Sequence, residues 1–131
     1  MKKALVILTM LVFAGCIRQT VHNTSTYLDG HSFEEVWGAS IKAVYDISFT
    51  VESMDVEAGF ISAESGTHIT QEVPPRLTIM ITDHRGKVFV ECRLLQKEQF
   101  IDILGHGKRT TRKFLTALNV NLNHGSRINT R

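Results

Sequence analysis

The chain has 131 residues, of which 15 are Lys or Arg and 13 are Asp or Glu, and its formal net charge is +2. The length suits one domain of ordinary size. The near balance of charge excludes a strongly charged polyelectrolyte.

The first 15 residues have the features of an export signal. Lys2 and Lys3 form a short positive region, residues 4–14 are apolar, and Ala14-Gly15 supplies the small side chains needed for cleavage. At about 1.5 Å per residue, this apolar run spans only about half of the hydrocarbon core of a bilayer. We therefore expect residues 1–15 to be a cleaved signal peptide and not a permanent transmembrane helix.

A cysteine follows this segment directly. The stretch Val12-Phe13-Ala14-Gly15-Cys16 resembles the lipobox of bacterial lipoproteins, although Phe13 stands where Leu is most common. The resemblance implies that the Cys16 thiol is diacylglycerylated, that the chain is cut before it, and that the new amine is acylated. Ile17, in place of Asp, implies transport to the outer membrane and a location on its periplasmic face. The alternative is a disulfide between Cys16 and Cys92 in a secreted soluble protein.

Charge is unevenly distributed along the remaining chain. Residues 17–104 carry all 13 acidic residues and seven basic ones, whereas residues 105–131 carry six basic residues and no acidic one. We therefore expect a basic C-terminal segment on an acidic body.

Residues 16–31 are expected to form the lipidated N-terminus and a tether, because they are rich in Thr, Ser and Asn and have few apolar positions. Within them, residues 21–28 provide a possible additional strand.

A helix is predicted to begin at about Phe33. Ser32 and Glu35 have the spacing of a capping box, in which each side chain satisfies a free backbone N–H of the other residue. An apolar stripe at helical spacing follows and is expected to face the core. Its members are Phe33, Val36, Trp37, Ile41 and Val44.

Four strands are predicted after this helix. Apolar and polar residues alternate over residues 47–52, and residues 60–65 form the hairpin partner. Pro74-Pro75 indicates a loop over residues 67–75. A second hairpin joins Leu77–Thr82 to Val88–Leu94, with Cys92 on its inward, apolar side.

The C-terminal part is predicted to be helical. Residues 96–107 are compatible with a short helix or a loop, a second helix covers residues 108–122, and residues 123–131 form a polar tail. The predicted class is α+β, with a twisted antiparallel sheet of about four strands and two helices on its apolar face. A single domain is expected over residues 32–122.

Residues 32–63 carry a pattern typical of a known group of proteins. It reads Phe33-x-x-Val36-Trp37-x-Ala39-x-x-x-Ala43-Val44, then Phe49-x-Val51 and Asp55-x-x-x-Gly59-x-Ile61-x-Ala63. This resembles small bacterial lipoproteins with a BamC-like helix-grip domain, many of which have no assigned role. BamC is an accessory lipoprotein of outer-membrane protein assembly. The resemblance implies a fold and supplies no catalytic residues.

Four basic residues at the start of the second helix are the candidate binding residues. Cations in the first turns oppose the helix dipole, so another interaction should favour them. One interpretation is pairing with acidic residues such as Glu98 or Asp102. The other is a patch for anionic lipid head groups, lipopolysaccharide, peptidoglycan-linked polymers or an acidic protein. The four residues are Lys108, Arg109, Arg112 and Lys113.

Known catalytic and cofactor motifs are not found. The six His lack the i, i+4 spacing that places two metal ligands on one helix face, and a core position would leave the Cys92 thiol inert. The segment Gly105–Thr110 only superficially resembles a phosphate loop, because Asp102 and Arg109 stand at positions that need Gly and Ser or Thr. No metal, cofactor or nucleotide is therefore expected, and export argues against nucleic acid.

The sequence favours a membrane-anchored envelope lipoprotein that acts as a non-enzymatic binding or accessory module. Its expected partners are the lipid bilayer, through acylated Cys16, and an envelope protein or anionic polymer. The alternatives are a small envelope hydrolase acting on peptidoglycan or lipid, a protein that binds anionic lipid or lipopolysaccharide through residues 108–113, and a structural spacer.

Overall fold

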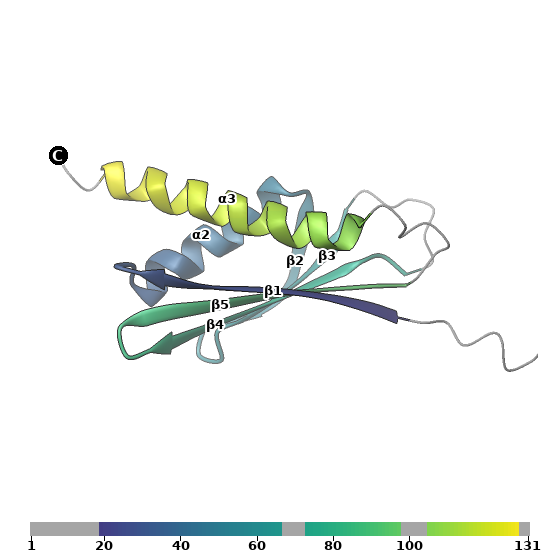
Figure 1. Ribbon diagram of the computed structural model, residues 1–131, viewed down its shortest axis with the longest axis horizontal. Helices are drawn as coiled ribbons and strands as arrows, with labels where there is room; N and C mark the ends of the chain where they lie inside the picture. The colour runs from purple at the N-terminus through teal and green to yellow at the C-terminus, as the bar shows by residue number, and fades with distance from the viewer. Residues whose placement is uncertain (1–18, 67–72, 98–104, 129–131) are drawn as a thin grey trace, which may run out of the picture.

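The computed structural model describes residues 19–66, 73–97 and 105–128. Two helices pack on one face of an antiparallel sheet (Figure 1). The elements in chain order are β1 (Gln19–Asp29), α2 (Phe33–Asp46), β2 (Phe49–Asp55), β3 (Phe60–Ser65), β4 (Arg76–His84), β5 (Lys87–Lys97) and α3 (His106–Ile128).

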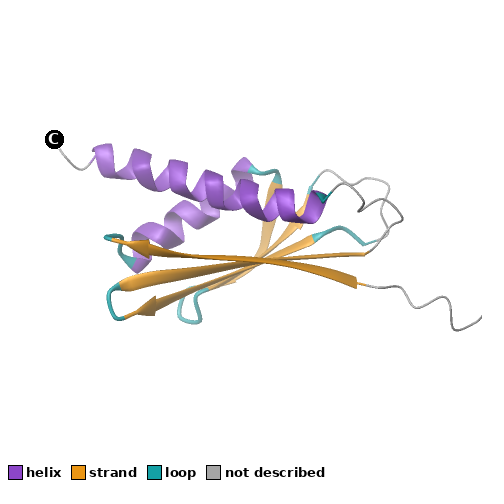
Figure 2. Cartoon of the chain, in the orientation of Figure 1, coloured by secondary structure: helices purple, strands orange, loops and turns teal. Residues whose placement is uncertain are grey.

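The five strands form one sheet in the order β1-β5-β4-β3-β2, and all neighbours are antiparallel. Figure 2 shows the twisted sheet below the two helices. The predicted α+β class, with two helices on one face, is confirmed. The four strands expected after the first helix are all present, and the possible fifth strand completes the sheet at its edge.

The tether expected over residues 16–31 is wrong for residues 19–29, which form β1. This strand pairs with β5 from Gln19, opposite Lys97, to Asp29, opposite Lys87. Only Leu28 contributes a buried apolar side chain to the core. Backbone hydrogen bonds to β5 hold this edge strand in place, which explains why its sequence shows so little apolar pattern.

The first helix begins as predicted. The backbone N–H of Glu35 donates to Ser32 Oγ at 3.2 Å, and the backbone N–H of Ser32 donates to Glu35 Oε2 at 3.0 Å. Both halves of the capping box are therefore formed.

The buried face of α2 differs from the predicted stripe. Val36 and Val44 are buried as expected, but Phe33, Trp37 and Ile41 are only half-buried at the margin of the core. The rings of Phe33 and Trp37 stack with their centroids 5.9 Å apart. The remaining buried positions are the small residues Ser40 and Ala43.

The core lies between the helices and the inner face of the sheet. The inward side of the second hairpin is confirmed, since alternate residues of β4 and β5 are buried, including Cys92. Among the described residues, the largest fully buried side chains are Phe114, Ile61, Leu77, Ile79, Ile81, Leu94 and Leu118.

The second helix is longer than predicted. It extends from His106 to Ile128, so the polar tail expected over residues 123–131 is wrong as far as residue 128. Phe114, Leu118 and Leu122 are buried as expected, and Leu115 is half-buried. Neither helix in the described part of the chain is both long and apolar enough to cross a bilayer.

Some sequence predictions fall outside the described residues. These include the signal peptide over residues 1–15, Cys16 itself, and most of the ambiguous segment 96–107. Within that segment β5 continues to Lys97, and α3 begins at His106.

Candidate anion-binding groove

The four predicted cations lie in the first two turns of α3, and all four side chains are exposed. Lys108 and Arg112 are four residues apart, as are Arg109 and Lys113, so the four form two neighbouring rows on the helix surface. The structure therefore groups all four candidate residues.

A hollow of about 830 Å³ lies beside these cations. Its other side is the turn from α2 into β2, at Asp46, Ile47 and Ser48. We call this hollow the basic groove. Its described lining residues are Asp46, Ile47, Ser48, Gly105, Lys108, Arg109, Arg112, Lys113, Thr116 and Ala117. The sequence predicted the basic side of this groove. It did not predict that the turn at residues 46–48, about 60 residues earlier in the chain, forms the other side.

The cations of the groove have no carboxylate partner among the residues that the structure describes. The ion pairs in that part of the chain involve Lys42, Arg76, Lys87, Arg93 and the imidazole of His31. Glu98 and Asp102, the partners considered for residues 108–113, lie outside the described residues. The positive end of the α3 dipole adds to the charge at this site.

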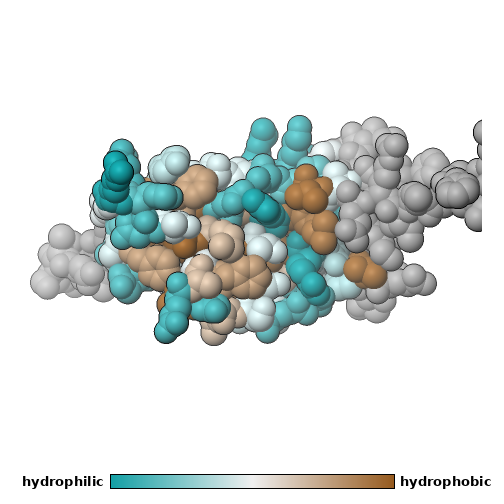
Figure 3. All heavy atoms as spheres, turned by 90° about the horizontal axis from the view of Figure 1, so that it is seen from below, coloured by the Kyte–Doolittle hydropathy of each residue, from teal (hydrophilic) through white to brown (hydrophobic). Residues whose placement is uncertain are grey.

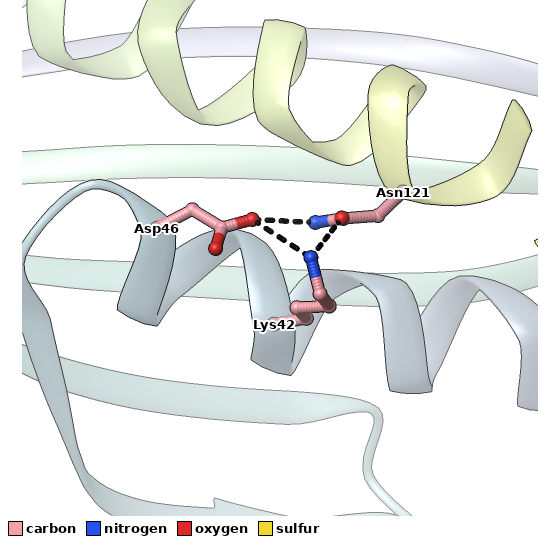
Figure 4. A network of polar contacts seen from close by, with 3 residues as sticks. All are labelled: Lys42, Asp46 and Asn121. Carbon is pink, nitrogen blue, oxygen red and sulfur yellow. Dashed lines mark hydrogen bonds and ion pairs between the residues drawn. The ribbon is translucent and has the colours of Figure 1, made fainter. Parts of the chain in front are cut away.

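Asp46 is the single carboxylate among the described lining residues, and it is already engaged (Figure 4). Asn121 Nδ2 donates to Asp46 Oδ2 at 2.9 Å, and Lys42 Nζ lies 3.4 Å from the same oxygen. Lys42 Nζ also donates to Asn121 Oδ1 at 2.6 Å. The Asn121 hydrogen bond, followed by the charge of Lys42, lowers the pKa of Asp46. Asp46 is therefore ionised at neutral pH, and Lys42 offsets its charge.

The start of α3 is fixed against β1. Thr24 Oγ1 donates to Thr111 Oγ1 at 3.0 Å, and Thr111 Oγ1 donates to the carbonyl oxygen of Lys108 at 3.1 Å. Thr111 is fully buried. Gly107 packs so closely on the ring of His22 that a Cβ would overlap with it. These contacts hold the backbone that carries the cations in one position.

No protein-family profile matches this chain, and no curated protein matches its sequence. Solved structures do match its fold. A protein from Mesorhizobium loti aligns with a TM-score of 0.57 and 11% identity, covering 82% of this chain and 98% of the other. An uncharacterised protein from Bacillus thuringiensis aligns with a TM-score of 0.53 and 12% identity, over 81% and 98%. Ara h 8.0201 aligns with a TM-score of 0.51 and 7% identity, over 80% and 99%.

The fold is helix-grip-like. At identities of 7–12%, the similarity to these three solved structures concerns the fold alone. The sequence resemblance to helix-grip domains is therefore confirmed at the level of architecture.

Cys92 lies in the core of this helix-grip-like fold. Burial raises the pKa of its thiol to about 12. Because the thiolate is the nucleophilic form, the thiol is inert in the folded protein at neutral pH. In the described residues, no three His, Cys, Asp or Glu side chains are grouped so that they could hold a metal ion.

Proposed function

We propose that this protein is a membrane-anchored lipoprotein of the bacterial cell envelope, with a BamC-like domain that acts as a non-enzymatic binding module. The observation that carries the proposal is the basic groove. Its four exposed cations have no carboxylate partner in the described part of the chain. The groove suits an anionic partner.

The chemistry of the groove favours binding over turnover. Arg presents a planar fork of donors to phosphate or carboxylate, and Lys adds a compact charge. Ser48 and Thr116 supply hydroxyl groups in the same lining. A hydrolase would also need an activated nucleophile or a carboxylate free to act as a base. Asp46 is held instead by Lys42 and Asn121.

The proposed anchor is the acylated thiol of Cys16. Two or more acyl chains bind a bilayer durably, whereas one chain alone binds only marginally. We therefore propose that the protein remains on the periplasmic face of the outer membrane.

Intact-mass analysis of the full-length chain, expressed in a bacterial host, tests this anchor. We expect a mature protein that begins at Cys16 and carries the added mass of a diacylglyceryl group and an N-acyl chain. Cys16→Ser should remain unprocessed, while the control Cys92→Ser should be processed like the wild type. A mature wild-type chain with an unmodified residue 16 would refute the anchor.

Elution from a phosphate-bearing resin tests the groove. The double variant Lys108→Gln, Lys113→Gln should elute at lower salt than the wild type. The control, Arg85→Gln with Lys87→Gln, makes the same change in net charge on the β4–β5 turn and should elute at higher salt than the groove variant. Equal elution of the two variants would show that net charge, and not the groove, determines binding.

The hydrolase alternative is tested by incubating the purified protein with peptidoglycan and with phospholipid. A binding module releases no product, whereas product released by the wild type but not by the groove variant would favour the hydrolase.

A further inference from the structure

The start of β1 lies at the same end of the molecule as the start of α3, which carries the cations of the basic groove (Figure 1). The start of α3 packs directly on β1, with Gly107 against His22 and Thr111 bonded to Thr24. Gln19, where β1 begins, is three residues before His22, or about 10 Å away at the usual rise of a strand. The first turn of α3 therefore lies close to the point where the chain enters the fold.

The link from Cys16 to this point is short. Only Ile17 and Arg18 stand between Cys16 and Gln19. Because an extended chain spans at most about 3.6 Å per residue, the Cα atoms of Cys16 and Gln19 are no more than about 11 Å apart. An acylated Cys16 would therefore hold this end of the domain next to the bilayer.

The opposite end of the domain is kept away from the anchor. The β4–β5 turn pairs with the far end of β1, where Lys87 lies opposite Asp29. The 11 residues of β1 place that turn about 33 Å from Gln19. A lipid anchor at Cys16 would thus lie much closer to one end of the domain than to the other, and the cations of the groove are at the closer end.

We infer that the basic groove binds the head groups of anionic lipids in the same leaflet that holds the acyl chains of Cys16. This inference rests on the proposed function, because it requires the anchor. The attraction of a cation to an anionic membrane surface falls off within a Debye length, about 8 Å at physiological salt. The link of at most about 11 Å and the about 10 Å from Gln19 to His22 together keep the first turn of α3 within about 21 Å of the anchor, so its cations reach the surface when this end of the domain faces the bilayer.

The charge pattern favours lipid over an acidic protein as the partner. A protein must bind from solution, whereas head groups surround the anchor at all times and every cation that reaches them adds to the attraction. The two rows of cations on α3 form a broad positive surface, which suits many small head groups at once.

Lysine acetylation on vesicles tests the inference with the mature, acylated protein. The protein is reconstituted in vesicles of phosphatidylcholine alone or of phosphatidylcholine with phosphatidylglycerol. A water-soluble acetylating reagent is then added, and modification is measured by peptide mass spectrometry. We expect Lys108 and Lys113 to react roughly fivefold more slowly on the anionic vesicles. Lys87, at the far end, is the internal control and should react equally on both.

The outcomes separate the two proposals. An unmodified residue 16 overturns the anchor and with it this inference. Acylated protein with equal Lys108 and Lys113 rates on both vesicles overturns only the inference. If Lys108 and Lys113 are protected only when an envelope extract is added, on both kinds of vesicle, the partner of the groove is a protein. That result would also overturn the lipid inference.

A longer link provides a second test. Inserting ten Gly and Ser residues between Arg18 and Gln19 leaves acylation and the fold in place but lets the domain move away from the surface. Protection of Lys108 should fall toward its value on neutral vesicles. Undiminished protection would show that the short link is not what brings the groove to the lipid.

Discussion

At the scale of single residues, Gly59 explains one position of the helix-grip-like sequence pattern. Its φ is +66°, and a Cβ at this position would overlap with the carbonyl oxygen of Ile81. The backbone N–H of Ile81 donates to the carbonyl oxygen of Gly59 at 2.8 Å. The glycine therefore allows the β2–β3 turn to lie directly against β4, and its role is structural.

We expect Gly59→Ala to destabilise the protein by about 3 kcal/mol, because a left-handed conformation and a backbone overlap are combined. The matched control is Gly38→Ala. Gly38 lies within α2 with open space around it, so alanine should stabilise the helix there by about 0.5–1 kcal/mol. Urea unfolding measures both changes. Similar midpoints for the two variants would contradict the close approach at Gly59.

Cys92 is the second residue whose behaviour follows from its position. Burial raises the pKa of the Cys92 thiol to about 12, so at pH 8 its ionised fraction in the folded protein is roughly a thousandfold lower than that of a free cysteine. We expect a thiol reagent to modify Cys92 about a thousandfold more slowly in buffer than in concentrated urea. The Cys16→Ser variant makes Cys92 the single thiol for this measurement. Fast modification of the folded protein would place Cys92 outside the core.

At the scale of elements, the contact between α2 and α3 depends partly on Asn121. Its side chain accepts a hydrogen bond from Lys42 and donates one to Asp46. The pKa of Asp46 is lowered in the folded protein, chiefly by this hydrogen bond. An acid with a lowered pKa contributes stability above its unfolded value, near 3.8, and this contribution is lost as the pH falls through the folded value.

Asn121→Ala should therefore reduce the melting temperature more at pH 6 than at pH 2. Asn119→Ala, on the same helix and with an exposed side chain, is the control and should show no such pH dependence. Melting curves of both variants at the two pH values provide the measurement. An equal loss at both pH values for Asn121→Ala would show that the carboxylate of Asp46 does not contribute.

The elements themselves could largely be predicted from local sequence, and the errors have physical causes. The capping box set the start of α2 because it is a local interaction between Ser32 and Glu35. The buried face of α2 was misplaced because Ser40 and Ala43 are too small to stand out as core residues, yet they allow close packing. Only one side of the groove could be predicted, since Ile47 and Ala117 line the same hollow but are far apart in the sequence, and no local pattern records that proximity.

At the scale of the whole molecule, the two faces of the sheet are unequal. One face is covered by both helices, and the other is open (Figures 1 and 3). On the open face, apolar side chains alternate with polar ones. Tyr27 packs on Phe89 with ring centroids 4.7 Å apart. Beside them, the side chains of Asn23 and Arg93 both donate hydrogen bonds to Glu91 Oε1. The alternating sequence pattern predicted this mixed face, because each strand has one buried and one exposed side.

The edges of the sheet are less evident from sequence than its faces. β1 covers the edge of β5, whose inward residues Val88, Val90 and Leu94 belong to the core. Without β1, the row of backbone N–H and C=O groups on β5 would be exposed over its length, and such edges promote aggregation. The strand is therefore part of the fold and not a flexible leader to it.

This role of β1 can be tested with N-terminally truncated variants. A chain that starts at residue 19 retains every described strand, so its free energy of unfolding should be within about 0.5 kcal/mol of that of a chain that starts at residue 16. A chain that starts at residue 30 loses β1, including Leu28 and the hydrogen bond from Thr24 to Thr111. We expect it to aggregate or to lack a cooperative unfolding transition. If it instead unfolded cooperatively with the same midpoint, residues 19–29 would act as a tether after all, and the short link between the anchor and the groove would have to be abandoned.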